Sequence, residues 1–246
     1  MERLLFHTGR YFMLLGSIFK TPEKFSVYYH LALAEAISMT AGSMFIVVII
    51  SSFMGAVTTL NTAYQLTTGL LPSSIIGSVV SVSTLLELAP TVMSFILTGR
   101  IGSNIASQIG TMRVTEQIDA LEVMGINSSG YLIIPRIAAG LISFPILVTI
   151  SAFLCTLGGM IAGYVSGEVT PYDYTLGIQT YYDPYQVVVM YVKSVVFGFI
   201  ITSVAAYHGY YTQGGALEVG RSATKAVVYG CLTMVFADYM VAQLLL

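Results

Sequence analysis

Residues 36–60 read AISMTAGSMFIVVIISSFMGAVTTL and contain no Asp, Glu, Lys or Arg. The charge-free stretch continues through residue 86, and the first charged side chain after it is Glu87. A helix that crosses the hydrocarbon core of a bilayer needs about 20 consecutive, mostly apolar residues. The stretch exceeds that length, and it therefore predicts a membrane protein.

The composition of the whole chain points the same way. Of its 246 residues, 56% are hydrophobic and only 9% are charged, and the mean hydropathy is +0.81. The formal net charge of −2 is too small to indicate a nucleic acid or another polyanion as a partner. We predict an all-α, polytopic membrane protein.

Five long apolar stretches predict five transmembrane helices. They lie at about residues 35–62, 74–107, 130–166, 185–211 and 224–246. The residues before them resemble an amphipathic helix that lies in the membrane interface. We therefore divide the chain into an N-terminal interfacial segment, 1–30, and a transmembrane domain, 31–246.

The distribution of Lys and Arg predicts the orientation in the membrane. One set of loops and flanking segments contains Arg3, Arg10, Lys20, Lys24, Arg113, Arg136, Arg221 and Lys225. The opposite set, at 62–73 and 167–184, contains no basic residue. Because segments rich in Lys and Arg stay on the cytoplasmic side, we predict a cytoplasmic N-terminus. Five crossings then place the C-terminus on the opposite, periplasmic side.

The segment between the second and third predicted spans is rich in charge. Residues 110–126 read GTMRVTEQIDALEVMGI. At 100° per residue, the charged and apolar side chains fall on opposite halves of a helix. The charged set is Arg113, Glu116, Asp119 and Glu122, and the apolar set is Val114, Ile118 and Leu121. The pattern predicts a short amphipathic helix at about 113–124.

Flanking residues indicate the ends of this predicted helix. Thr115 is a candidate N-cap, and Gly125 is suited to end the helix. Two interpretations are open. Either the helix lies in the interface with its charges facing water, or it packs its apolar face on the membrane domain and offers its acidic face to a cytoplasmic partner.

Three ionisable residues, Glu87, Lys193 and Asp238, lie inside predicted spans. Exposure of such a charge to lipid costs at least ~3 kcal/mol, so these residues usually face a bundle interior or a wet cavity. Pro90 lacks an N–H and predicts a kink that frees a backbone carbonyl near Glu87. One interpretation is a buried ion pair or a snorkelling cation. The other is a polar element that lines a transport pathway.

Apolar and small residues suggest two features of the spans, a cavity wall and close helix packing. As a candidate wall of a cavity for acyl chains, we name Leu85, Leu88, Val92 and Phe95. Ordinary helix packing is the alternative for each of them. Small residues at a spacing of four allow helix backbones to approach closely. Two rows have this spacing, Gly102, Ala106 and Gly110, and Gly159, Gly163 and Gly167.

Several sequence motifs are absent. There is no G-x-x-x-x-G-K-[ST], so this chain does not bind ATP through a P-loop. There is no H-E-x-x-H, no C-x-x-C and no cluster of His and carboxylates suited to a metal ion. We therefore predict no catalytic site, no metal site and no cofactor in this chain.

Three separated blocks of the chain carry a recognisable pattern. Residues 87–140 contain an E-x-x-P opening, a G-R-x-G run that ends in I-G, T-E-Q-I-D-A-L, a following M-G, and P-R. The later blocks are VKSVVFG (192–198) and GGALEVGRSATKAVV (214–228). In these blocks the chain resembles the MlaE (YrbE) permease family, and the resemblance covers the chain from about residue 30 onward. One departure is Leu86, where some members carry Arg.

The resemblance implies a homodimeric permease of an ABC transporter in a bacterial inner membrane. Its partners would be a cytoplasmic ATPase, which binds ATP and Mg²⁺, a periplasmic MCE-domain protein and, in some systems, a STAS-domain subunit. The substrate class would be phospholipid, moved between the inner and outer membranes. The helix at 113–124 would couple the permease to the ATPase. Glu87, Lys193 and Asp238 would lie near the central cavity.

Two other classes of function remain as alternatives. An ion- or proton-coupled secondary transporter would use Glu87, Lys193 and Asp238 as a relay. A structural scaffold for a membrane assembly would need neither these residues nor the acidic pair Asp119 and Glu122. Transport by the chain alone under a proton gradient would favour the first alternative.

Overall fold

The computed structural model describes the backbone of residues 2–18, 25–66 and 72–245. Lys20 and Lys24, which support the predicted orientation, lie outside these residues, as does the side chain of Arg3. Helices make up 90% of the structure, and the described residues contain no β-strand. The predicted all-α class is therefore confirmed.

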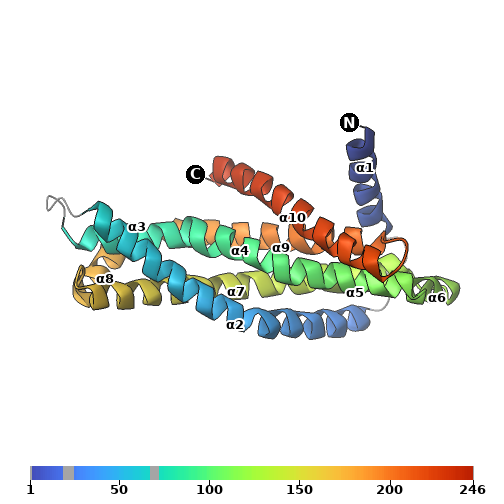
Figure 1. Ribbon diagram of the computed structural model, residues 1–246, viewed down its shortest axis with the longest axis horizontal. Coiled ribbons are helices and arrows are strands. Elements are labelled where there is room, and N and C mark those ends of the chain that lie inside the picture. The colour runs from blue at the N-terminus through green and yellow to red at the C-terminus, as the bar shows by residue number, and fades with distance from the viewer. Residues whose placement is uncertain (1, 19–24, 67–71, 246) are drawn as a thin grey trace. The chain divides into compact units, whose positions relative to one another are not determined.

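The helices follow one another with short connections (Figure 1). In chain order they are α1 (Glu2–Ser17), α2 (Phe25–Gln65), α3 (Ser74–Ser83), η1 (Thr84–Val92), α4 (Met93–Leu97), η2 (Thr98–Gly102), α5 (Ser103–Val114), α6 (Gln117–Val123), α7 (Ser128–Ser166), α8 (Pro171–Thr180), α9 (Pro184–Tyr210) and α10 (Ala216–Leu245).

Within the described residues, five helical stretches are long and apolar enough to cross a membrane, as predicted. They are Ser26–Gln65, Ser74–Val114, Ser128–Ser166, Pro184–Tyr210 and Ala216–Leu245. The last begins well before the predicted position 224. Its first turns are charged rather than apolar, and Glu218 and Arg221 form an ion pair there. A hydropathy pattern misses such turns because they are helical but not hydrophobic.

The second span is a continuous helix that changes its winding twice. The π-helical segments η1 and η2 interrupt the α-helical segments α3, α4 and α5. Pro90 lies inside η1 and cannot donate a backbone hydrogen bond. Where the sequence predicts a kink, the structure accommodates the proline in a wider π turn, a feature that often occurs at functional sites.

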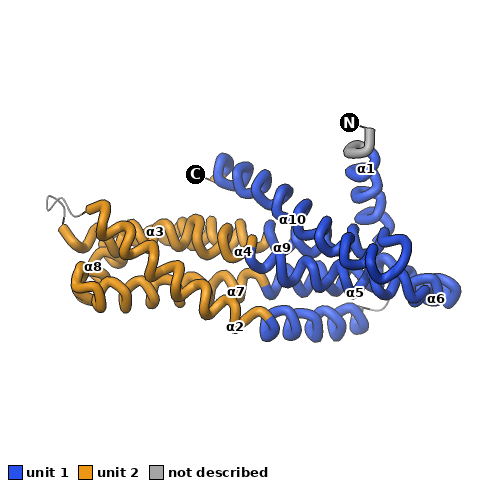
Figure 2. The backbone as a smooth tube through the Cα atoms, in the orientation of Figure 1, with its two compact units in different colours: residues 1–42, 96–143, 196–244 blue, residues 43–95, 144–195, 245–246 orange. Residues whose placement is uncertain are grey.

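The chain forms two compact units, which Figure 2 shows in different colours. Unit 1 consists of residues 1–42, 96–143 and 196–244, and unit 2 of residues 43–95, 144–195 and 245–246. Unit 1 therefore contains α1, η2, α5 and α6, whereas unit 2 contains α3, η1 and α8. Helices α2, α7 and α9 contribute residues to both units.

In unit 2, α2 and α7 pack backbone against backbone. A Cβ atom on Gly55 would lie 1.7 Å from the carbonyl oxygen of Cys155, and one on Gly158 would lie 2.2 Å from that of Ser52. No side chain fits at either position, so both glycines are required by the close approach. The sequence analysis did not single out Gly55 or Gly158.

The predicted row of Gly159, Gly163 and Gly167 has a mixed outcome. A Cβ on Gly159 would lie 2.4 Å and 2.5 Å from the hydroxyl oxygens of Thr59 and Tyr174, and one on Gly163 would lie 3.3 Å from a methyl group of Thr59. These two glycines are helix contacts, as predicted. Gly167 follows the end of α7 and makes no such contact. Burial next to this row raises the pKa of the Tyr174 hydroxyl to about 12.

In unit 1, one face of α1 packs on α9. Its contacts are Tyr11 Oη to Ser203 Oγ at 2.7 Å, His7 Nδ1 to Tyr207 Oη at 2.8 Å, and the Arg10 guanidinium 3.7 Å from the centre of the Tyr211 ring. The burial of Tyr11 raises the pKa of its hydroxyl. The opposite face exposes Phe6, Phe12 and Met13. This division of apolar and polar faces suits a helix in the membrane interface.

Candidate functional site

The charged segment between the second and third spans begins with a break in the helix. Helix α5 ends at Val114, and Thr115 donates its hydroxyl back to the carbonyl oxygen of Thr111 at 2.8 Å. Glu116 then has φ 60° and ψ 12°, which is the left-handed region. It is the one non-glycine residue with positive φ in the part of the chain that the structure describes. Helix α6 starts immediately after it.

The end of α6 at Gly125 is as predicted. Gly125 has φ 79°, and its N–H donates to the carbonyl oxygen of Glu122 at 3.0 Å. The N–H of Ile126 donates to that of Leu121, also at 3.0 Å. These two bonds form a Schellman motif, in which glycine supplies the left-handed residue.

The predicted helix at 113–124 is therefore too long. Helix α6 covers only Gln117–Val123, and Thr115 ends α5 instead of capping α6. Because the left-handed residue Glu116 changes the direction of the chain, an angle counted from Arg113 does not apply beyond it. Arg113 belongs to the end of the second span.

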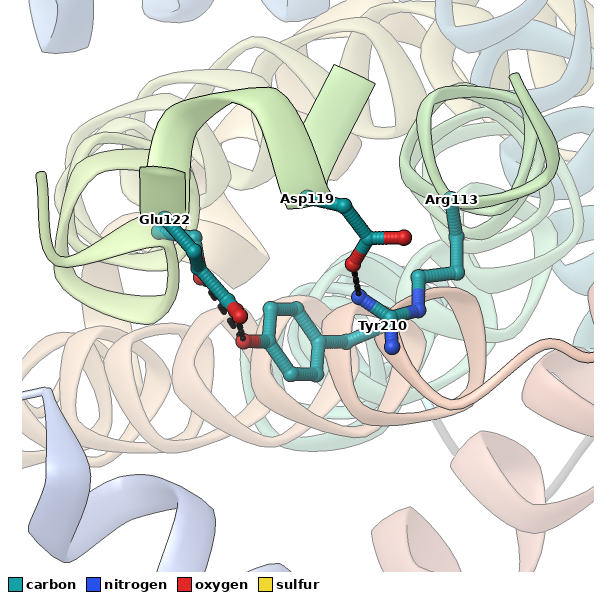
Figure 3. A network of polar contacts seen from close by, with 5 residues as sticks. Arg113, Asp119, Glu122 and Tyr210 are labelled. Atoms are coloured by element: carbon teal, nitrogen blue, oxygen red, sulfur yellow. Dashed lines mark hydrogen bonds and ion pairs between the residues drawn. The ribbon is translucent and has the colours of Figure 1, made fainter. Parts of the chain in front are cut away.

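Two of the four predicted charged residues form an ion pair across the break. Arg113 Nη1 lies 2.6 Å from Asp119 Oδ1 (Figure 3). The side chains are 34% and 52% exposed, so water screens the attraction. Exposed pairs of this kind contribute about 0–1 kcal/mol. This pair joins the end of α5 to the middle of α6.

Glu122 holds α6 against two other helices of unit 1. Its Oε1 accepts a hydrogen bond from Ser128 Oγ of α7 at 2.8 Å and one from Tyr210 Oη of α9 at 3.3 Å (Figure 3). The hydroxyls of Ser128 and Tyr210 also lie 2.8 Å apart. The acidic face that the sequence suggests for a partner is thus partly occupied by contacts within the chain.

The apolar side of α6 is also divided. Ile118 is fully buried and anchors the helix, as its place on the apolar face predicts. Val114 and Leu121 are half-buried. At the far end of α6, Val123 is 90% exposed and Met124 is 65% exposed. Two adjacent apolar side chains, which no described residue covers, give the end of α6 a surface that a partner protein can cover.

A second charged site lies in unit 2, inside the membrane-spanning helices. Lys193 of α9 is fully buried, and its Nζ lies 2.9 Å from Glu87 Oε1 of η1. The same Nζ donates to the carbonyl oxygen of Leu86 at 2.9 Å. In an α-helix this carbonyl would accept from the N–H that Pro90 lacks. The carbonyl predicted to be free near Glu87 therefore has Lys193 as its partner.

This geometry separates an ion pair from a snorkelling cation, the two forms of the first interpretation of Lys193. A snorkelling lysine would extend its ammonium group to the interface, but this ammonium group is buried and bound on two sides. Lys193 and Glu87 form an ion pair, with the Glu87 side chain 51% exposed. The exposed carboxylate and the π turn beneath it are compatible with a polar element on a pathway.

Comparison with known proteins assigns the chain to a family. A family model described as Permease MlaE matches residues 32–244. The chain belongs to the MlaE permease family. It is similar to a probable ABC transporter permease protein of Rickettsia bellii, with 34% identity over 94% of this chain and 87% of the relative.

Two further relatives of this MlaE-family chain have more specific names. The intermembrane phospholipid transport system permease protein MlaE of Haemophilus influenzae is 26% identical over 95% of this chain and 89% of its own length. The chloroplastic protein trigalactosyldiacylglycerol 1 of Arabidopsis thaliana is 32% identical over 82% of this chain and 57% of its own length. The chain is thus a permease subunit of an ABC transporter, a class that has no nucleotide-binding site of its own and works with a partner ATPase.

The other predicted site residues of this MlaE-family chain are half-buried. Asp238 is half-buried on α10 in unit 1. Leu85 packs against a buried cluster that contains Ala89, Val148 and Met190. The remaining candidates for a cavity wall, Leu88, Val92 and Phe95, are half-buried.

Several side-chain contacts in this MlaE-family chain were not predicted from the sequence. Tyr210 and Ser128 contact Glu122 from distant positions, and no spacing rule connects them. Gln108 and Glu35 contact the buried Arg136, which the sequence places only among the basic residues near span ends. Gln108 and Glu35 lie at the ends of the predicted spans, where polar side chains are expected, so the sequence carries no signal for either contact.

Proposed function

We propose that this chain is the membrane subunit of an ABC transporter that moves phospholipid between the inner and outer membranes of a bacterium. The observation that carries the proposal is the family match over residues 32–244, together with a relative named for intermembrane phospholipid transport. Spans that are mostly apolar suit a cargo with acyl chains. The chain would act as a homodimer in the inner membrane.

Helix α6 would be the site of coupling to the ATPase. The distribution of Lys and Arg supports a cytoplasmic position for the span ends next to α6, with the N-terminus on the same side and the C-terminus in the periplasm. Since this chain has no P-loop, ATP and Mg²⁺ would bind to the partner, and the energy of hydrolysis must enter through a contact. Val123 and Met124 would form the centre of that contact, and Glu116, at the other end of α6, would add to it.

On the periplasmic side, we propose an MCE-domain protein as the partner that receives or delivers lipid. A STAS-domain subunit would bind to the ATPase. Within the membrane, the exposed carboxylate of Glu87 and its buried partner Lys193 would form a polar part of the path, with Asp238 as a third ionisable group.

A gentle pull-down of the chain from its native membrane tests the proposal, with proteins and lipids identified by mass spectrometry. We expect a P-loop ATPase, an MCE-domain protein and phospholipid. Recovery of the chain without these partners would overturn the proposal. In that case an ion- or proton-coupled transporter based on the Glu87–Lys193 pair becomes the alternative, and transport by the purified chain in liposomes under a proton gradient would test it.

A further inference from the structure

Unit 1 contains an open cleft between side chains of α5 and α7. Its volume is about 420 Å³, and it is lined by Ser107, Gln108, Thr111, Met112 and Arg136. Two hydroxyls, an amide and a guanidinium can form hydrogen bonds there, and Met112 adds an apolar wall. This combination suits a ligand that joins an anionic group to an apolar body.

Arg136 is the charged group of this cleft, and it is 8% exposed. Its Nη1 donates to the carbonyl oxygen of Leu132 at 2.8 Å. Its Nη2 has two longer contacts, Gln108 Oε1 at 3.3 Å and Glu35 Oε1 at 3.6 Å. Its Nε is buried and has no hydrogen-bond partner among the described residues. One edge of the guanidinium is therefore incompletely bound.

That edge has the geometry of an anion receptor. Nε–H and one Nη2–H of an arginine point in the same direction and match two oxygens of a phosphate or carboxylate. A buried N–H without a partner is costly, and a ligand oxygen would remove that cost. Glu35 approaches the same edge from α2, but at 3.6 Å it is beyond normal hydrogen-bond length.

A polar stripe on the second span leads along the helix to this cleft. Arg100, Asn104, Gln108 and Thr111 recur at intervals of three or four, and all four are exposed on this chain. Gln108 Nε2 donates to Asn104 Oδ1 at 3.4 Å, which shows that neighbouring members of the stripe face each other. Such a stripe is unfavourable against lipid chains. It is favourable against water or lipid headgroups.

We infer that this cleft binds the phosphate group of an anionic phospholipid. Arg136 would bind two phosphate oxygens through Nε and Nη2, and Thr111 and Ser107 would donate their hydroxyls. Glu35 competes with the phosphate for the same edge. The inference rests on the proposed lipid transport and adds to it the place where a headgroup binds.

Native mass spectrometry of the full-length, detergent-purified chain tests this assignment. The chain is incubated with equimolar phosphatidylglycerol and diacylglycerol that carry the same acyl chains, so that only the phosphate-containing headgroup differs. We expect preferential retention of phosphatidylglycerol. Arg136→Gln should reduce that preference about tenfold, because a charge-assisted hydrogen-bond pair is lost.

Two further variants separate binding from folding. Glu35→Gln should increase the preference several-fold, because a competing anion is removed, and a misfolded protein would not bind more tightly. Thr111→Val, at the exposed rim of the cleft, should reduce it about threefold. Arg221→Gln removes a basic charge that pairs with Glu218 outside the cleft, and it should change nothing.

Two results would overturn the assignment. One is an unchanged preference in both Arg136→Gln and Glu35→Gln. The other is displacement of phosphatidylglycerol by an excess of inorganic phosphate, which would assign the cleft to a soluble phosphate. Because the assay contains no ATPase, its outcome is independent of the pull-down. A chain that retains lipid without any dependence on Arg136 would refute the cleft and leave the proposed transport intact.

Discussion

Arg113 and Asp119 form an ion pair with side chains 34% and 52% exposed, whereas Lys193, in its pair with Glu87, is fully buried. Both pairs have short nitrogen-to-oxygen distances, 2.6 Å and 2.9 Å. Their surroundings differ much more than their geometry. Water and salt screen the first pair, and the protein interior screens the second far less.

The comparison shows that a high density of charge in a sequence does not mark the residues that matter most. The α6 region carries four charged residues, but the ion pair between Arg113 and Asp119 is screened by water and contributes little. Lys193 stands alone in an apolar helix, and its burial makes its partners indispensable. Depth in the span is thus a better guide to importance than clustering.

The largest expected effect is the loss of Glu87. Glu87→Leu removes the carboxylate that pairs with the buried Lys193 ammonium and leaves its hydrogen bond to Leu86 O, and we expect destabilisation of about 3 kcal/mol. The double variant Glu87→Leu with Lys193→Met should recover to within about 1 kcal/mol, because it removes both charges. Thermal unfolding in detergent measures both. A single variant as stable as the unmodified chain would show that the buried Lys193 does not depend on Glu87.

The next effect concerns the attachment of α6. Glu122→Ala should speed hydrogen exchange of the Gln117–Val123 amides by an amount that corresponds to about 1 kcal/mol. Tyr210→Phe removes one of the two donors and should have part of that effect. In a double-mutant cycle the two changes should not add, because they remove one contact. Full additivity would show that the carboxylate and the hydroxyl do not interact.

Glu116 permits a test in the stabilising direction. Glu116→Gly should stabilise the α5–α6 turn by about 0.5–1 kcal/mol, because glycine adopts positive φ without the steric cost of a Cβ. Glu116→Ala keeps the Cβ and serves as the matched control. Slower hydrogen exchange of α6 in the glycine variant alone is the expected result, and equal exchange in both variants would refute backbone strain at this position.

The smallest expected effect is that of Arg113→Gln. Its loss should destabilise the turn by less than about 1 kcal/mol at low salt and by almost nothing at 1 M salt. Hydrogen exchange of α6 at two ionic strengths measures the difference. A large effect that persists at high salt would show that the pair is shielded from water. The Arg113–Asp119 pair would then not differ from the Lys193–Glu87 pair in its screening.

The sequence predicts those features that depend on local composition. Long apolar runs identify the five spans, Pro90 indicates the interrupted backbone hydrogen bond beside Glu87, and Gly125 indicates the end of α6. Each of these follows from a single residue type or from periodicity within one helix. The same periodicity places Ile118 on the apolar face, together with Val114 and Leu121.

The features that the sequence does not predict depend on contacts between distant segments or on one backbone angle. A helical wheel assumes an unbroken helix, and the positive φ of Glu116 violates this assumption. The pairing of Glu122 with Tyr210 requires knowledge of which helices are neighbours. Gly55 and Gly158 lie on different helices, and only the close approach of those helices shows that neither position tolerates a side chain.

The most direct test of the account is site-specific photo-crosslinking at Val123 in the native membrane. A photoreactive amino acid at this position, which is 90% exposed, should crosslink to a P-loop ATPase. Val165, which is 77% exposed near the opposite end of α7, is the control and should not do so. A crosslinked ATPase at Val123 alone would establish α6 as the coupling surface. Absence of that product, or an equal yield at Val165, would contradict it.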